Sequence, residues 1–353
     1  MPYQFRNLVF EGGGVKGIAY VGALGVLEQK GILKNIKRVG GTSAGAIIAL
    51  LIGLGYSLSE IENILTTLNF KNFLDDSWGI LRDAERIVHE YGLYKGDFFL
   101  HWAEEKVGEK TGDPEATFGE IANRGGFRDM YFMGVNLSTG YAEVFSAEKT
   151  PAVSLAYAVR ISMSIPLFFA AIKVPSQGEV QRVYVDGGVI DNYPIKLFDR
   201  MKYLDPNIKQ NYRETDYYKE HNQELVKAGK VISPYVFNKE TLGFRLDTAT
   251  EIGVFRDDKE PPKRQINNLV DYAQALWAGL TGVQQSMHLH SDDWQRSIYI
   301  DTLGVGTTDF NLSDETKKAL KQSGQKGADE YFKWYDDPRN GAVNRPDVND
   351  IAT

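Results

Sequence analysis

The first 55 residues alternate between strand and helix patterns, and this alternation limits the fold more than any other feature. Residues 7–10 form a short apolar stretch typical of a buried strand, and residues 17–30 repeat apolar side chains at helical spacing. A second strand-like stretch ends in a tight turn at residues 40–45, and residues 46–54 follow as an apolar helix. The sequence therefore predicts a layered α/β fold with a mostly parallel central sheet and helices on both faces.

The later segments extend this pattern without an internal repeat. We expect mostly helices over residues 57–125 and strands at residues 129–146, which surround a Ser-Thr-Gly turn. Residues 199–240 are rich in Tyr, Lys, Asp, Asn and Gln, which indicates an insertion or cap. The predicted division is a single domain at 1–335 with core motifs at 6–200, an insertion at about 199–240, C-terminal strands and helices at 241–335, and a loose tail at 336–353.

Composition excludes several classes of function. The 353 residues carry a net charge of −7, so no basic bias indicates nucleic-acid binding. The absence of cysteine excludes disulfides, thiolate metal sites and cysteine nucleophiles. The N-terminus lacks the zones of a secretory signal, and the apolar run at 44–56 is shorter than the roughly 20 residues of a membrane span. We expect a cytoplasmic protein; peripheral membrane contact and secretion without a cleavable signal remain open, and the sequence does not indicate an oligomeric state.

The glycines of "FEGGGVKG" have three interpretations. Gly12, Gly14 and Gly17 fit G-x-G-x-x-G between a strand and a helix, as in a dinucleotide site, but residues 35–39 lack the expected carboxylate and only Arg38 favours NADP. Alternatively, bare backbone N–H groups at a helix N-terminus stabilise an oxyanion. In the third interpretation, the glycines simply permit close packing of helix and strand.

A second motif, "GGTSAGA", places Ser43 between two glycines, Gly41 and Gly45, at the turn from strand to helix. In the G-x-S-x-G arrangement such a turn projects the serine hydroxyl from the sheet, and the following N–H, that of Ala44, points toward the same space. The alternative is that Ser43 is an ordinary helix N-cap.

A serine hydroxyl needs a base, and the chain offers two kinds. His288 and His290 give the chain order of a conventional Ser-His-Asp esterase, although H-x-H is also half of a metal site. Asp186 follows an apolar strand and precedes Gly187 and Gly188, which favours a carboxylate facing the crevice at the strand ends. An Asp-Gly turn without function is the alternative.

Together, "GGGVKG" (12–17), "GTSAG" (41–45) and "DGG" (186–188) resemble, in this order, the motifs of the patatin-like phospholipase family. "ISMSIPLFF" (161–169) and "DNYP" (191–194) are similar to further family segments. The resemblance implies a three-layer α/β/α patatin-like fold and a serine acyl hydrolase of the phospholipase A or lysophospholipase type, without metal or cofactor. Its substrate would be a lipid or phospholipid, and the runner-up is a non-catalytic lipid-binding module.

The resemblance also implies roles for single residues. Ser43 would be the nucleophile and Asp186 the base. The residues that would form the oxyanion hole are Gly12, Gly13, Gly14 and Ala44. The residues that would support the motifs are Lys16, Gly17, Gly41, Gly45, Gly187 and Gly188.

Two kinds of segment are candidates for contact with a membrane. Residues 98–105 and the Tyr-rich insertion at about 199–240 are rich in aromatic side chains, and residues 34–38 and 261–264 are basic. Core aromatics and solvated charge are the alternative.

Overall fold

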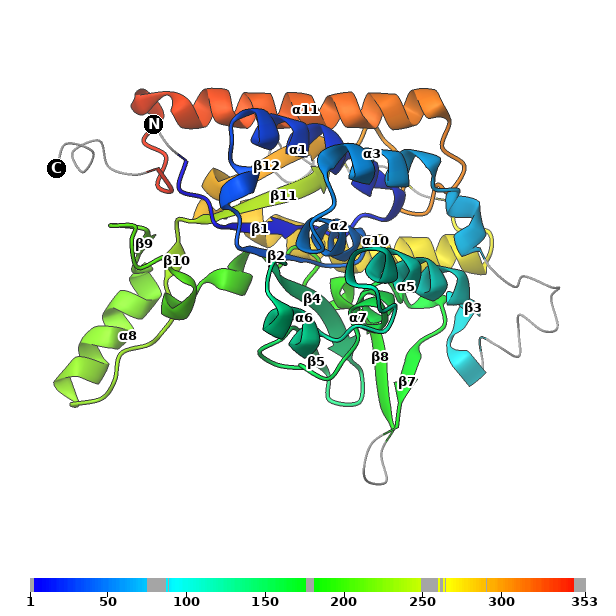
Figure 1. The fold of residues 1–353 in the computed structure, drawn as a ribbon, viewed down its shortest axis with the longest axis horizontal. Coiled ribbons are helices and arrows are strands. Elements are labelled where there is room, and N and C mark those ends of the chain that lie inside the picture. Colours follow the sequence, from blue (N-terminus) through cyan, green and yellow to red (C-terminus); the bar gives the residue numbers. More distant parts are fainter. Residues whose placement is uncertain are drawn as a thin grey trace.

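One mixed sheet organises the chain in a computed structural model that describes residues 3–74, 87, 89–175, 181–248, 260, 263, 265–289 and 291–345 (Figure 1). Its strands are β1 (Asn7–Phe10), β2 (Arg38–Gly41), β4 (Asp129–Asn136), β5 (Tyr141–Phe145), β7 (Ile172–Val174), β8 (Arg182–Asp186), β11 (Thr241–Asp247) and β12 (Ser297–Asp301). The order is β12-β11-β1-β2-β4-β8-β7, with β5 paired to β4. The first five strands in this order, β12, β11, β1, β2 and β4, pair in parallel. Strands β8, β7 and β5 add antiparallel pairs.

Helices and short strand pairs fill the connections. The helices are α1 (Ala19–Gln29), α2 (Ala44–Gly53), α3 (Leu58–Thr67), α5 (Asp97–Thr111), α6 (Phe118–Arg124), α7 (Leu155–Ser162), α8 (Asp216–Lys227), α10 (Leu269–Leu289) and α11 (Asp314–Asp336). The 3-10 turns are η1 (Gly14–Ile18), η2 (Leu33–Asn35), η3 (Phe70–Phe73), η4 (Gly187–Val189), η5 (Ile195–Phe198), η6 (Met201–Tyr203), η7 (Asp292–Arg296) and η8 (Pro338–Asn340). The two-stranded sheets are β3 (Gly92–Tyr94) with β6 (Leu167–Phe169), and β9 (Tyr212–Arg213) with β10 (Phe237–Asn238).

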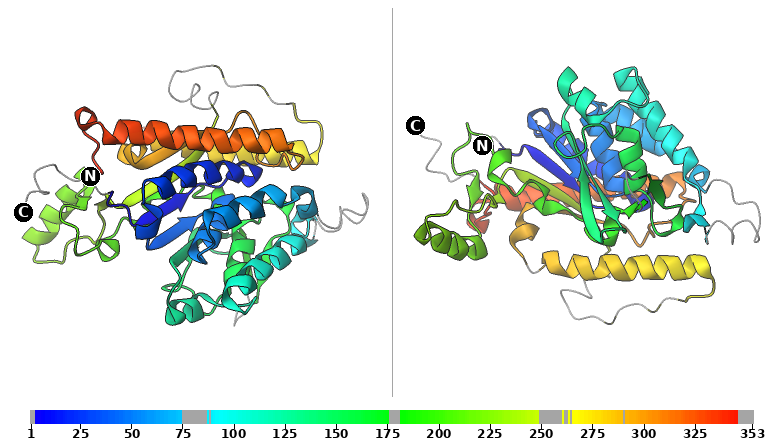
Figure 2. Two further views of the ribbon diagram at one scale, coloured as in Figure 1. Left: turned by 45° about the horizontal axis from the view of Figure 1, so that its top comes forward. Right: turned by 90° about the horizontal axis from the view of Figure 1, so that it is seen from below.

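The two faces of the sheet carry separate apolar clusters because side chains alternate along a strand. Leu8 and Phe10 belong to the large core with α1, α2, α7 and α11, whereas Val9 packs with residues of η5 and η6. Figure 2 shows α10 on the other side of the sheet from α1 and α2. The predicted three-layer α/β fold, with a mostly parallel sheet and helices on both faces, is confirmed.

Helices α1 and α11 lie against each other, with glycine at the contact (Figure 1). A Cβ on Gly22 would lie 1.8 Å from Lys321 O, and one on Gly324 would lie 1.8 Å from Ala19 O. Only glycine permits this approach of the two backbones. Helix α2, predicted as a buried core helix, is indeed buried along its whole length. Among the described helices, none has both the length and the apolar character needed to cross a membrane.

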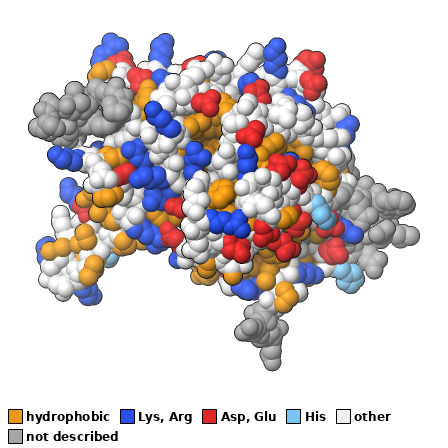
Figure 3. Space-filling model, in the orientation of Figure 1, with side chains coloured by type: hydrophobic (Ala, Val, Ile, Leu, Met, Phe, Trp, Pro, Cys, Tyr) orange, Lys and Arg blue, Asp and Glu red, His pale blue; other side chains and the backbone are white. Residues whose placement is uncertain are grey.

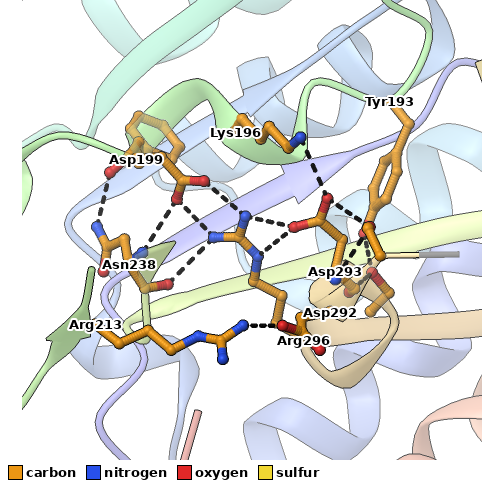
Figure 4. A network of polar contacts seen from close by, with 11 residues as sticks. Tyr193, Lys196, Asp199, Arg213, Asn238, Asp292, Asp293 and Arg296 are labelled. Atoms are coloured by element: carbon orange, nitrogen blue, oxygen red, sulfur yellow. Dashed lines mark hydrogen bonds and ion pairs between the residues drawn. The ribbon is translucent and has the colours of Figure 1, made fainter. Parts of the chain in front are cut away.

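The insertion predicted at about 199–240 contains η6, β9, α8 and β10, and α8 projects from the body in Figure 1. A buried guanidinium ties its base to the sheet (Figure 4). Arg296 donates to Asp199 at 2.6 and 2.7 Å and to Asp293 at 2.7 Å, and its side chain is fully buried. Bidentate contacts of this kind fix orientation as well as charge.

The end of the chain differs from expectation in part. Residues 342–345, which belong to the tail predicted to be loose, pack against the body, whereas 338–341 are exposed. Asn344 is fully buried, and its side chain donates to the Tyr331 hydroxyl at 2.9 Å. The remaining tail, 346–353, lies outside the described residues.

Arg296→Met will lower the free energy of unfolding by roughly 3–5 kcal/mol, because it leaves two buried carboxylates without their cation. The measurement is urea denaturation. Lys326→Met is the control, since the Lys326–Glu330 pair is exposed at 76% and 68% and is expected to contribute less than about 1 kcal/mol. Equal losses in the two variants would contradict the assignment of Arg296 as a structural anchor.

Candidate active site

Ser43 lies in a strained turn between β2 and α2. Its φ of 54° and ψ of −126° belong to backbone that non-glycine residues rarely adopt. The turn also presses against β1: a Cβ on Gly45 would lie 2.3 Å from Phe10 O, and one on Gly41 would lie 2.9 Å from the same oxygen. The flanking glycines therefore allow the serine turn to sit at the carboxyl end of the sheet.

Asp186 approaches this turn from the opposite direction. Strand β4 is longer than β2: its residues 129–132 pair with β2, and 134–136 pair with β8. Because β5 occupies the other edge of β4 over 132–136, β2 and β8 share one edge. They run in opposite directions, so their carboxyl ends meet. We expected Asp186 in the crevice of a parallel sheet; instead, an antiparallel strand carries it there.

Two serines at and just after the end of α7 connect the Ser43 turn with Asp186. The Ser43 N–H donates to Ser162 Oγ at 3.0 Å, and the Asp186 N–H donates to Ser164 O at 2.9 Å. Buried Arg160 in turn donates to Ser164 Oγ at 2.6 Å. Sequence reasoning noted the "ISMSIP" segment only as a resemblance; these serines bridge the backbones that carry Ser43 and Asp186.

The carboxyl group of Asp186 is fully buried. Burial raises its pKa to about 7, against the lowering effects of hydrogen bonds from the Gly188 N–H, at 2.8 Å, and from the Ser43 hydroxyl. The contact with Ser43 is not a well-formed bond: Asp186 Oδ2 has no partner of good geometry, and the Ser43 hydroxyl points toward Met163 Sδ at 3.5 Å. Thus the structure brings Ser43 and Asp186 together with one carboxylate oxygen still available.

Three backbone N–H groups of the predicted oxyanion hole are free. Within the described residues, the N–H groups of Gly13, Gly14 and Ala44 have no hydrogen-bond partner. Gly12 differs, since its N–H donates to Asn192 O at 3.0 Å, which corrects its expected role as a donor. Its lack of a side chain matters instead: a Cβ there would lie 3.1 Å from Ser43 Cβ.

Asn192 was not singled out from the sequence. It holds the glycine loop, residues 12–14, against the Asp186 turn, which is formed by Asp186 and η4. Its Nδ2 donates to Gly12 O at 3.1 Å and to Glu11 Oε1 at 3.2 Å. Its own N–H donates to Gln284 Oε1 at 2.8 Å, and Gln284 Nε2 donates to Gly188 O at 3.0 Å. Its place in "DNYP" was the only signal in the sequence, and nothing there indicated Gln284.

Glu11 turns away from the free N–H groups, as strand alternation predicts. Its carboxylate accepts from the Leu246 N–H at 2.8 Å and lies 4.0 Å from Arg245 Nε. Burial is the largest effect on Glu11 and raises its pKa to about 7, against the opposing charge of Arg245. Arg245 also donates to Asp247 at 2.8 Å, so this buried cluster supports the loop from β11.

The other motif residues bring segments close together. A Cβ on Gly17 would lie 3.3 Å from Ala44 Cβ, and one on Gly187 would lie 2.6 Å from Met133 Cβ. One on Gly188 would lie 2.7 Å from the Trp277 ring. Lys16 is buried, and its charge also lowers the pKa of Glu11. These positions therefore support the site by packing.

The alternatives find less support at this site. Arg38, the candidate for NADP, donates to Tyr203 O at 3.0 Å and to Asn7 Oδ1 at 3.3 Å. None of the described contacts of Ser43 and Asp186 involves a histidine. His290 lies outside the described residues, as does the side chain of His288.

The remaining surface features have no described contact with Ser43 or Asp186. Phe99 and Trp102, in the aromatic stretch named as a candidate for membrane contact, are buried in the core, as the alternative interpretation predicts. A cavity of about 810 Å³ lies between the insertion and η7, and no residue of the three motifs lines it. Most of the basic segment at 261–264 is outside the described residues.

Comparison with known proteins agrees with this geometry. The family model described as "Patatin-like phospholipase" matches residues 8–199. The protein YqhO of Bacillus subtilis (strain 168), named as uncharacterized, is 30% identical over 335 residues, which are 92% of this chain and 97% of that protein. The chain belongs to the patatin-like phospholipase family.

Two other matches extend the family likeness. The "Probable lipid hydrolase 463L" of Invertebrate iridescent virus 6 is 28% identical over 216 residues, 61% of this chain and 69% of that protein. The structure of VipD from Legionella pneumophila matches with a TM-score of 0.55 at 18% identity. The match covers 94% of this chain and 67% of the VipD chain. VipD therefore supports the patatin-like fold alone.

The Ser43→Gly variant will be more stable than the Ser43→Ala variant, because only alanine retains the cost of the positive φ. We expect this difference to exceed the glycine–alanine difference at an ordinary helix N-cap by about 1 kcal/mol. Ser154 is the control, since it caps α7 at a φ of −71°. The measurement is the difference between glycine and alanine variants in chemical denaturation at both positions. Equal differences would mean that the turn stores no strain.

Asp186→Asn will stabilise the protein most at alkaline pH. In the folded protein this carboxyl keeps its proton up to a pKa of about 7, whereas the ordinary pKa of an aspartate is 3.8. Its ionisation therefore costs stability as pH rises from about 4 to 7, and the amide removes a penalty of up to about 4 kcal/mol at pH 8. Denaturation midpoints at pH 5 and 8 test this, with exposed Asp329→Asn as control. A gain independent of pH would contradict it.

Proposed function

We propose that this protein is a lipid acyl hydrolase of the phospholipase A or lysophospholipase type, with Ser43 as nucleophile and Asp186 as general base. The observation that carries the proposal is the buried Asp186 carboxyl beside the Ser43 hydroxyl, with one oxygen unpaired. A pKa near 7 suits a group that must take and return a proton at neutral pH. Family membership and the name of the viral relative support a lipid substrate.

The reaction follows from these positions. Asp186 accepts the hydroxyl proton while Ser43 Oγ attacks the ester carbonyl, and negative charge develops on the carbonyl oxygen. The free N–H groups of Gly13, Gly14 and Ala44 are the candidate donors to that oxygen. The loss of one such donor typically reduces the rate about 10²- to 10³-fold. Protonated Asp186 then gives its proton to the departing alkoxide, which leaves an acyl-enzyme.

In the second half of the reaction, water releases the acyl group from Ser43. Asp186 takes a proton from water, whose oxygen attacks the acyl carbon, and the proton returns to Ser43 Oγ as the fatty acid leaves. The α2 N-terminus, which begins at Ser43, adds its dipole to the stabilisation of the oxyanion.

Ser43→Ala and Asp186→Asn will each lower the hydrolysis of a p-nitrophenyl ester and of a phospholipid by at least about 10³-fold, because the nucleophile or its base is lost. In the wild type, kcat/KM will rise with pH through an apparent pKa of about 7, because the base must be ionised. Assays from pH 5 to 9 measure both effects.

Glu11→Gln is the control for the pH profile, because the pKa of Glu11 is also about 7. The inflection near pH 7 should persist in this variant. Full activity in Ser43→Ala or Asp186→Asn would contradict the dyad, and loss of the inflection in Glu11→Gln would assign it to Glu11.

A further inference from the structure

Helix α10 has an unusual outer face. Leu269, Tyr272, Leu276 and Leu280 are 43%, 51%, 44% and 39% exposed. Their spacing of three, four and four residues places them in one stripe along the helix. The 21-residue helix contains no Lys or Arg, and Asp271 is its only carboxylate. By contrast, Lys, Arg, Asp and Glu are spread over the opposite side of the molecule, the face seen in Figure 3.

The inner face of the same helix packs on the candidate active site. Trp277 is 9% exposed and lies against Gly188, where a Cβ would be 2.7 Å from its ring. Gln284 bonds to the Asp186 turn through Gly188 O, and to the Asn192 N–H. Because Asn192 also binds Gly12 O, α10 is connected to both the aspartate turn and the glycine loop.

The site is closed in this arrangement. Ser43 is 1% exposed and Asp186 is 0% exposed, so the serine hydroxyl is shielded from solvent in this arrangement. Within the described part of α10, Gln284 bonds to Gly188, Val189 and Asn192, and Trp277 packs on Gly188. Figure 2 shows the helix lying along the outside of the molecule, so its displacement does not require the sheet to move.

A lipid surface fits the outer face better than a charged partner does. Leucine and tyrosine on a helix that contains no Lys or Arg are suited to the boundary between headgroups and acyl chains, where apolar area supplies the affinity. An anionic surface would call for Lys or Arg beside the stripe, and α10 has neither. The helix also connects this surface directly to a site whose proposed substrate is a lipid.

We propose that the stripe formed by Leu269, Tyr272, Leu276 and Leu280 docks on a zwitterionic phospholipid surface, and that docking releases the contacts of Trp277 and Gln284 and admits substrate to Ser43. The surface is then both the binding partner and the opening signal. This inference rests on the proposed function.

The first test separates docking from catalysis by using full-length Ser43→Ala protein. We expect it to co-float with phosphatidylcholine vesicles equally at 50 and 500 mM NaCl. Adding Leu276→Gln and Leu280→Gln should reduce the bound fraction at least fivefold. The matched control is Val226→Gln with Val231→Gln, at positions that are 63% and 90% exposed elsewhere on the surface, and it should leave binding unchanged. Circular dichroism melting checks that every variant is folded.

The second test uses the same substitutions in the active protein. The ratio of phosphatidylcholine hydrolysis in vesicles to hydrolysis of soluble p-nitrophenyl butyrate should fall about tenfold with Leu276→Gln and Leu280→Gln. It should remain constant in the Val226→Gln, Val231→Gln control. Vesicle binding without any hydrolysis by the wild type would contradict the proposed function and leave docking supported.

Three results would overturn the docking proposal. One is equal vesicle binding by the stripe variant and its parent. Another is binding that requires anionic lipid or disappears at 500 mM NaCl. The third is a wild-type dimer in light scattering that the stripe substitutions dissociate, which would assign this face to a second copy of the chain.

Discussion

The candidate site depends on the unequal length of two neighbouring strands. Strand β4 extends beyond the end of β2, and β8 fills the edge that β2 leaves free. Since β8 is antiparallel to β4, the strand that precedes Asp186 points toward the strand that precedes Ser43. A sheet that was parallel throughout would bring both residues to one end side by side. In this protein, the carboxyl ends of β2 and β8 face each other along one edge of β4.

Hydrogen bonds to the backbone then hold the two ends together. Ser162 and Ser164 fix the chain at Ser43 and Asp186, and Asn192 fixes the glycine loop. The site therefore combines rigid backbone with polar groups that are left unsatisfied: three N–H groups and one carboxylate oxygen. Buried groups of this kind are costly, and in stable proteins they are concentrated where a ligand or reaction uses them.

The sequence was sufficient to predict the elements that depend on local patterns. Apolar runs and glycine turns located β1, β2 and α2, and the three motifs located Ser43 and Asp186. The direction of β8 was not predictable, because an apolar strand followed by Asp-Gly-Gly has the same local pattern in either orientation. The contact of Gln284 was hidden for a related reason: the contact joins residues almost one hundred positions apart. Nor did the sequence of the last residues, which we predicted to be loose, reveal that Asn344 has buried partners.

The position of β1 has a consequence for synthesis of the chain. This first strand is central in the sheet, and its second edge stays empty until β11, more than 200 residues later, has been translated. An unpaired strand edge is a site for wrong pairing, so the nascent chain needs protection until residue 247 has left the ribosome. The same delay affects the glycine loop, because Arg245 and Leu246 contact Glu11 beside that loop only after that point. The glycine loop of an incomplete polypeptide therefore lacks this support from β11.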